Sequence, residues 1–446
     1  MKNATVTFII GLLIIPVLSP VITSSTSEQA QKAPHTNLLA GGWVEQRDGL
    51  TILHVNGSHY QMGYQHGSLL REQVQEDIRA FLTFANASIS YDTLLGWWNL
   101  ESPYVPQEYK DEMQGVADGA GISYEGIAVA ITAIEYADHG CYGISAWGNA
   151  TTNGTLYHTR SFDLPSTIKD PVTGRHPYEN SILIVRKPDD GLASLAPSIA
   201  GSTHTGGGIN EDGVALGIQI CWSKDQTFEG NPYQFRVQAV LDHATTAQEA
   251  IDILNANRTH GFNFVVSQAS PAIGFALEQT ENLTYVGTYN GSAESLPPFY
   301  QLDHIVRRTN VFLDPTIAKT QRLLYDPSGF LSFLVLLLHK WIISPYYAVY
   351  HLYDSVSKQL VAANNSLDLN STMAALQNGY RSPNDFILRL IEILGKGTGM
   401  AEAWNQWTAC PSTGDLVVSF ADSSAMAYKT PVYYVNLFKL LHESPP

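Results

Sequence analysis

Cys141 opens the stretch of the sequence whose residue types are best suited to chemistry. A cysteine thiol becomes a nucleophile when a base or a positive charge favours the thiolate. Arg160 and Asp163 follow on the far side of a run of turn-forming residues. If 141–148 and 155–163 form a β-hairpin, the return strand lies beside the cysteine. Arg160 could then lower the pKa of the thiol or hold a substrate carboxylate, and Asp163 could orient an amine. The alternative is a buried cysteine beside an ordinary ion pair.

The number of cysteines gives Cys141 further weight. The chain has three, Cys141, Cys221 and Cys410, which is too few for a disulfide framework in a protein of this size. An odd number leaves at least one free thiol in an oxidising compartment. Cys221 and Cys410 could form a disulfide, or both could be buried apolar residues.

The N-terminal residues predict export. Lys2 precedes the apolar run 6–18, and small and polar residues follow over 19–30, which is the order of a signal peptide. An uncleaved anchor is the alternative, although a membrane span needs about 20 apolar residues. Nine sequons for N-glycosylation favour a secreted glycoprotein. Their asparagines are Asn56, Asn86, Asn149, Asn153, Asn257, Asn282, Asn290, Asn364 and Asn370.

The composition is that of an ordered globular protein with a large buried fraction. Of the 446 residues, 44% are apolar and 15% are charged. The net charge of −16 repels phosphate backbones, and no run of Lys and Arg occurs, so we expect no nucleic-acid partner.

The patterning changes at Gly140 from mainly helical to mainly strand-like. Before Gly140, apolar residues recur every three or four positions, which predicts helices. After it, short apolar runs alternate with turn formers. Predicted strands cover 49–55, 141–148, 156–162, 181–186, 214–221, 262–268 and 273–278, and predicted helices cover 60–85, 107–137 and 233–256. After Cys141 the predicted order is strands, then helices, then strands. This order favours an α+β fold with an antiparallel sheet over alternating βαβ units.

Three consecutive glycines, Gly206 to Gly208, suggest a phosphate-binding loop. We reject that interpretation because no Lys-Ser/Thr follows and the next predicted element is a strand. The sequence 206–213 instead predicts a tight turn before the strand 214–221.

Several motifs together resemble the penicillin acyltransferase (acyl-coenzyme A:6-aminopenicillanic acid acyltransferase) branch of the choloylglycine hydrolase clan, which are cysteine N-terminal-nucleophile (Ntn) hydrolases. No single motif is decisive, but their order and spacing are fairly specific over roughly residues 50–290. They are Met62-Gly-Tyr-Gln-His-Gly67, Glu112-Met-Gln-Gly-Val-Ala-Asp-Gly-Ala-Gly121, Gly140-Cys-Tyr-Gly-Ile-Ser-Ala-Trp-Gly148, Leu156-Tyr-His-Thr-Arg-Ser-Phe-Asp163 and Gly208-Ile-Asn-Glu-Asp-Gly-Val-Ala-Leu216.

The resemblance implies a four-layer αββα sandwich with two stacked antiparallel sheets and a mainly helical N-terminal pro-segment. On this basis we expect a signal peptide and linker over 1–30, a pro-segment or small chain over 31–140, and a catalytic domain over 141–446. The catalytic domain would carry an apolar helical insertion near 328–352.

The resemblance also implies autoproteolysis between Gly140 and Cys141. The freed α-amine of Cys141 would then serve as the general base, so that no dedicated histidine is needed. Arg160 and Asp163 would position the substrate and the amine. Among the remaining family positions, Asn263 matches an oxyanion-stabilising asparagine, Gln219 stands near a second one and departs from it, and Arg322 matches a late catalytic-site arginine. Thr309-Asn310 resembles a family Thr-Asn pair without the histidine that often follows it.

We therefore predict a self-processing hydrolase or acyltransferase that acts on a linear, small-molecule amide, with no cofactor and no metal. One alternative is a phospholipase-like esterase on the same scaffold, suggested by the apolar segment 330–343, which could touch a membrane or be a buried helix. Another is a non-catalytic glycoprotein or a zinc enzyme, although the 14 histidines lack metal-ligand spacing. The oligomeric state stays open.

Overall fold

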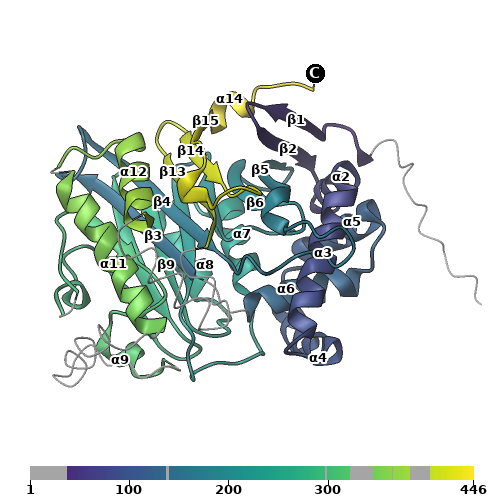
Figure 1. Cartoon of the computed structure of the whole chain (residues 1–446), viewed down its shortest axis with the longest axis horizontal. Helices are drawn as coiled ribbons and strands as arrows, with labels where there is room; N and C mark the ends of the chain where they lie inside the picture. The colour runs from purple at the N-terminus through teal and green to yellow at the C-terminus, as the bar shows by residue number, and fades with distance from the viewer. Residues whose placement is uncertain are drawn as a thin grey trace, which may run out of the picture.

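Two β-sheets lie face to face at the centre of the protein (Figure 1). The structure is a computed structural model that describes residues 38–136, 140–296, 299–321, 345–363, 365–381 and 402–445. Among these residues, the larger sheet has nine strands, in the order β1-β2-β5-β6-β7-β8-β9-β10-β11, and the smaller has six, in the order β12-β3-β4-β13-β14-β15. The larger sheet comprises β1 (Trp43–Arg47), β2 (Leu50–Gly57), β5 (Ser181–Pro188), β6 (Ser194–Ile199), β7 (Gly207–Asn210), β8 (Val214–Ile220), β9 (Phe262–Gln268), β10 (Ile273–Gln279) and β11 (Thr284–Gly287). The smaller sheet comprises β3 (Gly140–Gly148), β4 (Gly154–Asp163), β12 (Ile305–Arg308), β13 (Ala403–Cys410), β14 (Asp415–Phe420) and β15 (Tyr433–Asn436).

The β3–β4 hairpin confirms the pairing that the sequence predicts. Asn153 and Gly154 adopt positive φ angles of 60° and 73°, which suits a tight reversal between twisted strands. The antiparallel register then places Gly140 opposite Asp163 and Gly143 opposite Arg160. The strand pairing alone therefore brings the two predicted side chains to the level of Cys141.

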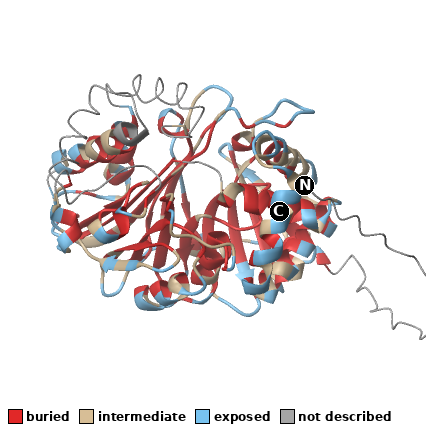
Figure 2. Cartoon of the chain, turned by 90° about the horizontal axis from the view of Figure 1, so that it is seen from below, coloured by how far each residue is buried: buried red, intermediate tan, exposed pale blue. Residues whose placement is uncertain are grey.

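Helices cover the outer face of each sheet, so the predicted four-layer αββα order is confirmed. Helices α7 (Tyr233–His243) and α8 (Ala247–Asn255) pack on the larger sheet, and α11 (Pro345–Ala362) and α12 (Leu369–Tyr380) cover the smaller. Side chains from both sheets form a common core between them, and one hydrophobic cluster unites Trp407 and Val418 of the smaller sheet with Leu183 and Val185 of the larger. Figure 2 shows this interior as continuously buried.

The N-terminal segment, residues 38–136 of the structure, is mainly helical but also extends the larger sheet. Its helices are α2 (His59–Leu69), α3 (Arg71–Asn86), α4 (Tyr91–Glu101), α5 (Gln107–Ala120) and α6 (Tyr124–Glu135). Strand β2 pairs with β5 in parallel, whereas the other strand pairs of both sheets are antiparallel. The two sheets are thus antiparallel, as expected, apart from this one pair, which joins the segment to the rest of the chain.

Glycines explain why two of the quoted N-terminal motifs occur together. Gly63 and Gly67 of α2 face Gly115 and Gly119 of α5, and the two helices touch backbone to backbone. A β-carbon on Gly63 would lie 2.0 Å from the carbonyl oxygen of Glu112. Since no side chain fits in that space, the glycines of both motifs are required by the packing of one helix pair.

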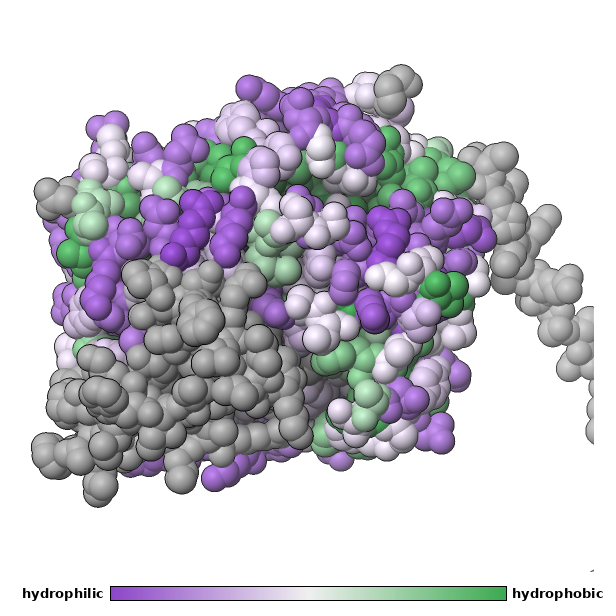
Figure 3. Space-filling view, in the orientation of Figure 1, coloured by the Kyte–Doolittle hydropathy of each residue, from purple (hydrophilic) through white to green (hydrophobic). Residues whose placement is uncertain are grey.

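Some predicted elements differ from the structure or lie outside it. The glycine-rich stretch does not form a turn throughout, because Gly207–Asn210 is strand β7 and only residues 211–213 turn. The predicted signal peptide and the apolar segment 330–343 lie outside the described residues. Within the described parts, no helix is long and apolar enough to cross a membrane. The face drawn in Figure 3 carries mostly hydrophilic side chains with small, separated hydrophobic groups, apart from the grey residues.

Candidate active site around Cys141

The Cys141 thiol lies between the two sheets and is fully buried. It is the second residue of β3, and the guanidinium Nη2 of Arg160 approaches its Sγ to 3.9 Å. Burial raises the pKa of the Cys141 thiol to about 12, and the Arg160 charge only partly offsets this effect. In the uncut chain the thiol is therefore protonated at neutral pH, so it needs a base before it can attack.

Arg160 reaches Cys141 through a passage that three glycines leave open. A β-carbon on Gly206 would lie 2.7 Å from its Nη2, one on Gly207 3.1 Å from its Cδ, and one on Gly217 2.6 Å from the same atom. The guanidinium stacks on the Phe162 ring at 5.0 Å, and its Nε donates to the carbonyl of Ile218 at 3.4 Å. The glycine-rich stretch thus makes room for an arginine and not for a phosphate.

Asp163 is the second predicted residue that the hairpin brings to the site. Its carboxylate accepts hydrogen bonds from Ser161 Oγ at 2.5 Å and from the Tyr380 hydroxyl of α12 at 2.7 Å. Burial raises the pKa of Asp163 to about 7, although both hydrogen bonds and the Arg160 charge favour the carboxylate. Asp163 can therefore gain or lose a proton near neutral pH, next to the strand that carries the thiol.

Thr309 and Asn310 bind the backbone of Cys141. The family resemblance pointed to this pair but implied no role for it. Asn310 Oδ1 accepts the Cys141 N–H at 3.0 Å, and its Nδ2 donates to the carbonyl of Ile220 at 2.8 Å. Thr309 Oγ1 donates to the Cys141 carbonyl at 3.0 Å. After cleavage the held nitrogen would be the α-amine. The resemblance to a family Thr-Asn pair was the one signal in the sequence that pointed to these residues.

Asn263 and Gln219 are register partners on β9 and β8, and both are fully buried. Both hydrogens of the Asn263 amide are donated to backbone carbonyls, those of Thr309 at 2.9 Å and Val311 at 2.8 Å. Gln219 Nε2 donates to the Gly217 carbonyl at 3.1 Å. In this state both N–H groups of Asn263 are engaged, whereas Gln219 uses one of its two. The oxyanion role predicted for the two amides stays a prediction. Arg322 lies outside the described residues.

A mainly apolar cavity borders the site on the side of Arg160. Arg160 and Phe162 form one wall of it, next to the buried thiol. The opposite wall comes from α3 and α6 of the N-terminal segment, through Phe81, Ile131 and Ile134. Polar residues also line the cavity, namely Ser198, Ser202, His204, Gln234 and Asn405 besides Arg160. The cavity has a volume of only about 30 Å³ in this state, so a substrate group would have to widen it, and its mainly apolar lining would favour an apolar group.

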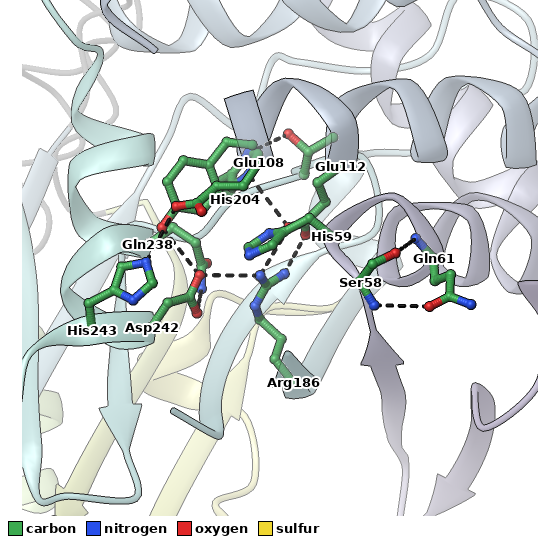
Figure 4. Close-up of polar contacts among 12 residues, drawn as sticks. Ser58, His59, Gln61, Glu108, Glu112, Arg186, His204, Gln238, Asp242 and His243 are labelled. Carbon is green, nitrogen blue, oxygen red and sulfur yellow. Dashed lines mark hydrogen bonds and ion pairs between the residues drawn. The ribbon is translucent and has the colours of Figure 1, made fainter. Parts of the chain in front are cut away.

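A buried ion pair joins the N-terminal segment to strand β5 of the larger sheet (Figure 4). Arg186 of β5 makes a two-pronged contact with Glu112 of α5, and both side chains are at most 2% exposed. Glu112 also accepts from His59 at 2.9 Å, and Asp242 of α7 lies 3.6 Å from Arg186. Two oppositely charged groups in a dry interior stabilise each other only as long as both stay in place.

The three cysteines are free thiols and all are buried. Cys221 Sγ contacts the Thr309 carbonyl at 3.5 Å and Cys410 contacts Ser412, so the disulfide considered for Cys221 and Cys410 is not formed.

One cluster with metal-ligand geometry occurs in the described parts of the chain, away from Cys141. It consists of Glu45, His54 and Glu443, whose ligand atoms lie within 4.8 Å of one another. Arg47 ion-pairs with both carboxylates, at 2.8 Å and 2.5 Å, and so supplies the positive charge that a cation would bring.

Comparison with known proteins confirms the predicted resemblance. The sequence model of the family "Acyl-coenzyme A:6-aminopenicillanic acid acyl-transferase" matches residues 169–332. Among curated proteins, Protein dcd1B of Dictyostelium discoideum is 26% identical over 242 residues, which is 47% of this chain and 46% of that protein. Protein dcd1A of the same organism is 24% identical over 47% of this chain and 54% of its own length. The chain thus spans about half the length of the curated relatives it matches.

Solved structures show weaker likenesses. An N-acylethanolamine-hydrolyzing acid amidase ortholog of Caenorhabditis elegans covers 66% of this chain and 100% of its own, with 12% identity and a TM-score of 0.39. A mutant of conjugated bile acid hydrolase from Clostridium perfringens covers 67% and 93%, with 12% identity and a TM-score of 0.36.

Proposed function

We propose that this chain, which matches the acyl-coenzyme A:6-aminopenicillanic acid acyl-transferase family over residues 169–332, is a self-processing amidohydrolase or acyltransferase with Cys141 as its nucleophile. One observation carries the proposal: the Cys141 thiol lies 3.9 Å from Arg160 while its backbone nitrogen is held by Asn310. A nucleophile, a cation and a fixed nitrogen thus meet at one residue. That arrangement suits a cysteine whose own amine becomes its base.

Self-cleavage would begin with attack of the Cys141 sulfur on the Gly140 carbonyl carbon. The C–N bond breaks, the thiol proton goes to the Cys141 nitrogen, and Gly140 remains attached to the sulfur as a thioester. Water then hydrolyses the thioester, which leaves a carboxylate on Gly140 and restores the thiol. We propose that Asp163, whose pKa of about 7 lets it gain or lose a proton near neutral pH, assists the proton transfer of the first step.

Turnover would repeat the same chemistry on a substrate amide. The neutral α-amine takes the thiol proton, the sulfur attacks the amide carbonyl, and the proton passes to the leaving amine. Arg160 favours the thiolate that forms on the way. Transfer of the acyl group to water completes hydrolysis, and transfer to a second amine completes acyl transfer.

The apolar cavity beside Arg160 supports an acyl group of low polarity. Its walls combine Phe162 with Phe81, Ile131 and Ile134 of the N-terminal segment. We propose a linear amide with an apolar acyl chain as the substrate class. The phospholipase alternative rested on the segment 330–343, and no observation on the described residues favours it.

The proposal is tested by the fate of the Gly140–Cys141 bond. Purified wild-type protein should separate into two fragments under denaturing conditions, and the larger should begin at Cys141 by mass spectrometry. Cys141→Ala should remain intact. Wild-type protein that stays uncut yet hydrolyses amides would contradict the mechanism.

Substrate class and acceptor can be tested on the processed enzyme. Aminocoumarin amides of saturated fatty acids of graded length report amide cleavage, and hydroxylamine reports transfer by forming a hydroxamate. Phosphatidylcholine vesicles serve as the ester probe. Fatty-acid release from vesicles without turnover of any amide would replace the amidase with a phospholipase.

We also propose that the protein is exported and glycosylated. Seven of the nine sequon asparagines are exposed: Asn86, Asn149, Asn153, Asn257, Asn282, Asn290 and Asn370. An endoglycosidase treatment that leaves the mass of the protein from its native source unchanged would contradict glycosylation.

A further inference from the structure

The segment 309–314 crosses from one sheet to the other directly over the nucleophile. It leaves β12, the neighbour of β3 in the smaller sheet, and runs to α9 (Pro315–Ala318) beside β9 and β10 of the larger sheet. Its first two residues, Thr309 and Asn310, bind the carbonyl and the nitrogen of Cys141. The position of the future α-amine therefore depends on what fixes this segment.

Asn263 fixes the start of the segment. Its Nδ2 donates to the carbonyls of Thr309 and Val311, at 2.9 Å and 2.8 Å, on either side of Asn310. A primary amide has two hydrogens to donate, and both are used here. Asn263 could not stabilise an oxyanion as well without releasing one of these carbonyls.

Glu278, the register partner of Asn263 on β10, fixes the two ends of the segment. Its carboxylate accepts from Arg308 Nε at 2.8 Å, from the Leu313 N–H at 2.9 Å and from the Asp314 N–H at 3.0 Å. Glu278 and Asn263 are both fully buried, so no water replaces these bonds without rearrangement. Asn263 and Glu278 of the larger sheet thus hold the segment 309–314, and the first two residues of this segment bind the backbone of Cys141.

We propose that Asn263 and Glu278 are positioning residues that act through the segment 309–314 to keep Asn310 against the α-amine of Cys141. This inference rests on the proposed function, and it assigns Asn263 a task other than the oxyanion role that the resemblance implies. A hydrogen bond from the amine to Asn310 Oδ1 is stronger for the charged ammonium, so Asn310 raises the pKa of the amine. Loosening the segment lowers that pKa and misplaces the base.

The test compares Asn263→Leu, Glu278→Gln and the double variant as processed enzymes. Each single change should lower kcat about 10- to 100-fold with a small change in KM, because the base is misplaced and the acyl cavity is untouched. Each should also move the acidic limb of the pH profile of kcat/KM to lower pH, by about half a unit or more. The double variant should lose little more than the larger single loss, because both changes release the same segment.

Glu294→Gln is the matched control. Glu294 contacts Arg308 at 2.7 Å, and Glu278 binds the same arginine, but within the described part of the chain the Glu294 carboxylate does not bond to the backbone of 309–314. This variant loses a buried charge from the same cluster and should keep the pH profile of the wild type. Thermal unfolding of all variants shows whether a loss of activity comes from a destabilised fold or from a displaced Asn310.

The outcomes are distinct. If the losses of kcat in the two single variants add up in the double variant, and the acidic limb of the kcat/KM profile does not move, Asn263 is an oxyanion donor and the inference is overturned. If Glu278→Gln does not fold, the acidic limb of Asn263→Leu decides alone: a shift supports positioning, and a fall in kcat without a shift contradicts it. A wild-type protein that neither cleaves itself nor turns over amides refutes the proposed function instead.

Discussion

A β-carbon on Gly217 would lie 2.6 Å from Cδ of Arg160, closer than two carbon atoms can approach. Gly217 is on β8 of the larger sheet and Arg160 on β4 of the smaller, so the glycine leaves the space through which the arginine crosses between the sheets. The Arg160 charge can therefore reach the Cys141 thiol only because Gly217 has no side chain.

Gly217→Ala should impair catalysis although it changes no reacting atom. The added methyl displaces Arg160 from the thiol, and we expect self-cleavage and turnover to fall about 100-fold. Gly208→Ala is the matched control, because its β-carbon would meet Ala196 and Leu195 at 2.9 Å and 2.7 Å and not Arg160. Both variants should melt at lower temperature than the wild type. Equal cleavage rates in the two variants would show that the passage around Arg160 does not matter.

Asp163→Asn should change how stability depends on pH. Burial raises the pKa of the folded Asp163 to about 7, against an ordinary value of about 4 in the unfolded chain. The unfolded chain releases the proton first, so this group costs the wild type stability as pH rises from about 4 to about 7. We expect the inactive variant to melt at a higher temperature than the wild type at pH 8, with the difference shrinking toward pH 4. A difference in melting temperature that is constant over this range would contradict the raised pKa.

The two fragments should stay together after cleavage. Strand β2 remains paired with β5, and Glu112 remains buried against Arg186. We expect both fragments to elute as one species in gel filtration. Glu112→Leu removes the two-pronged partner of Arg186 and leaves it only the more distant Asp242 at 3.6 Å, which should cost about 3–5 kcal/mol in urea unfolding. Glu112→Leu combined with Arg186→Met should recover part of that loss, since the unpaired charge is gone; no recovery would indicate that the pair does not act as a unit.

The Cys141 thiol should react with iodoacetamide only after self-cleavage. It is fully buried in the uncut chain and its pKa is about 12, so both access and ionisation oppose alkylation. Cleavage frees the Gly140 end to move and places an amine beside the sulfur. Mass spectrometry of the alkylated peptides checks this, with uncut protein held by Gly140→Pro as the comparison. Rapid labelling of Cys141 in uncut protein would contradict the buried position.

Much of the fold followed from local patterns. Alternating apolar residues and the turn at Asn153-Gly154 predicted the hairpin, and its register carried Arg160 and Asp163 to Cys141. Helical periodicity predicted helical stretches over 60–85 and 107–137, which the structure divides into α2 and α3 and into α5 and α6. Such features can be predicted because the atoms that form them lie within a few residues of one another along the chain.

The site itself was only half predictable. Thr309 and Asn310 reach Cys141 from a strand on the other side of β3, and Glu278 and Asn263 hold them from the opposite sheet. The parallel pairing of β2 with β5 likewise joins residues far apart in the chain. The sequence alone thus determined the hairpin that carries Cys141, Arg160 and Asp163 and the family that the chain resembles, and it predicted the nucleophile. Only the tertiary structure decided which amides bind the backbone of Cys141 and that the glycines leave room for Arg160, because those contacts arise when two sheets stack and are encoded by shape, with no local pattern to reveal them.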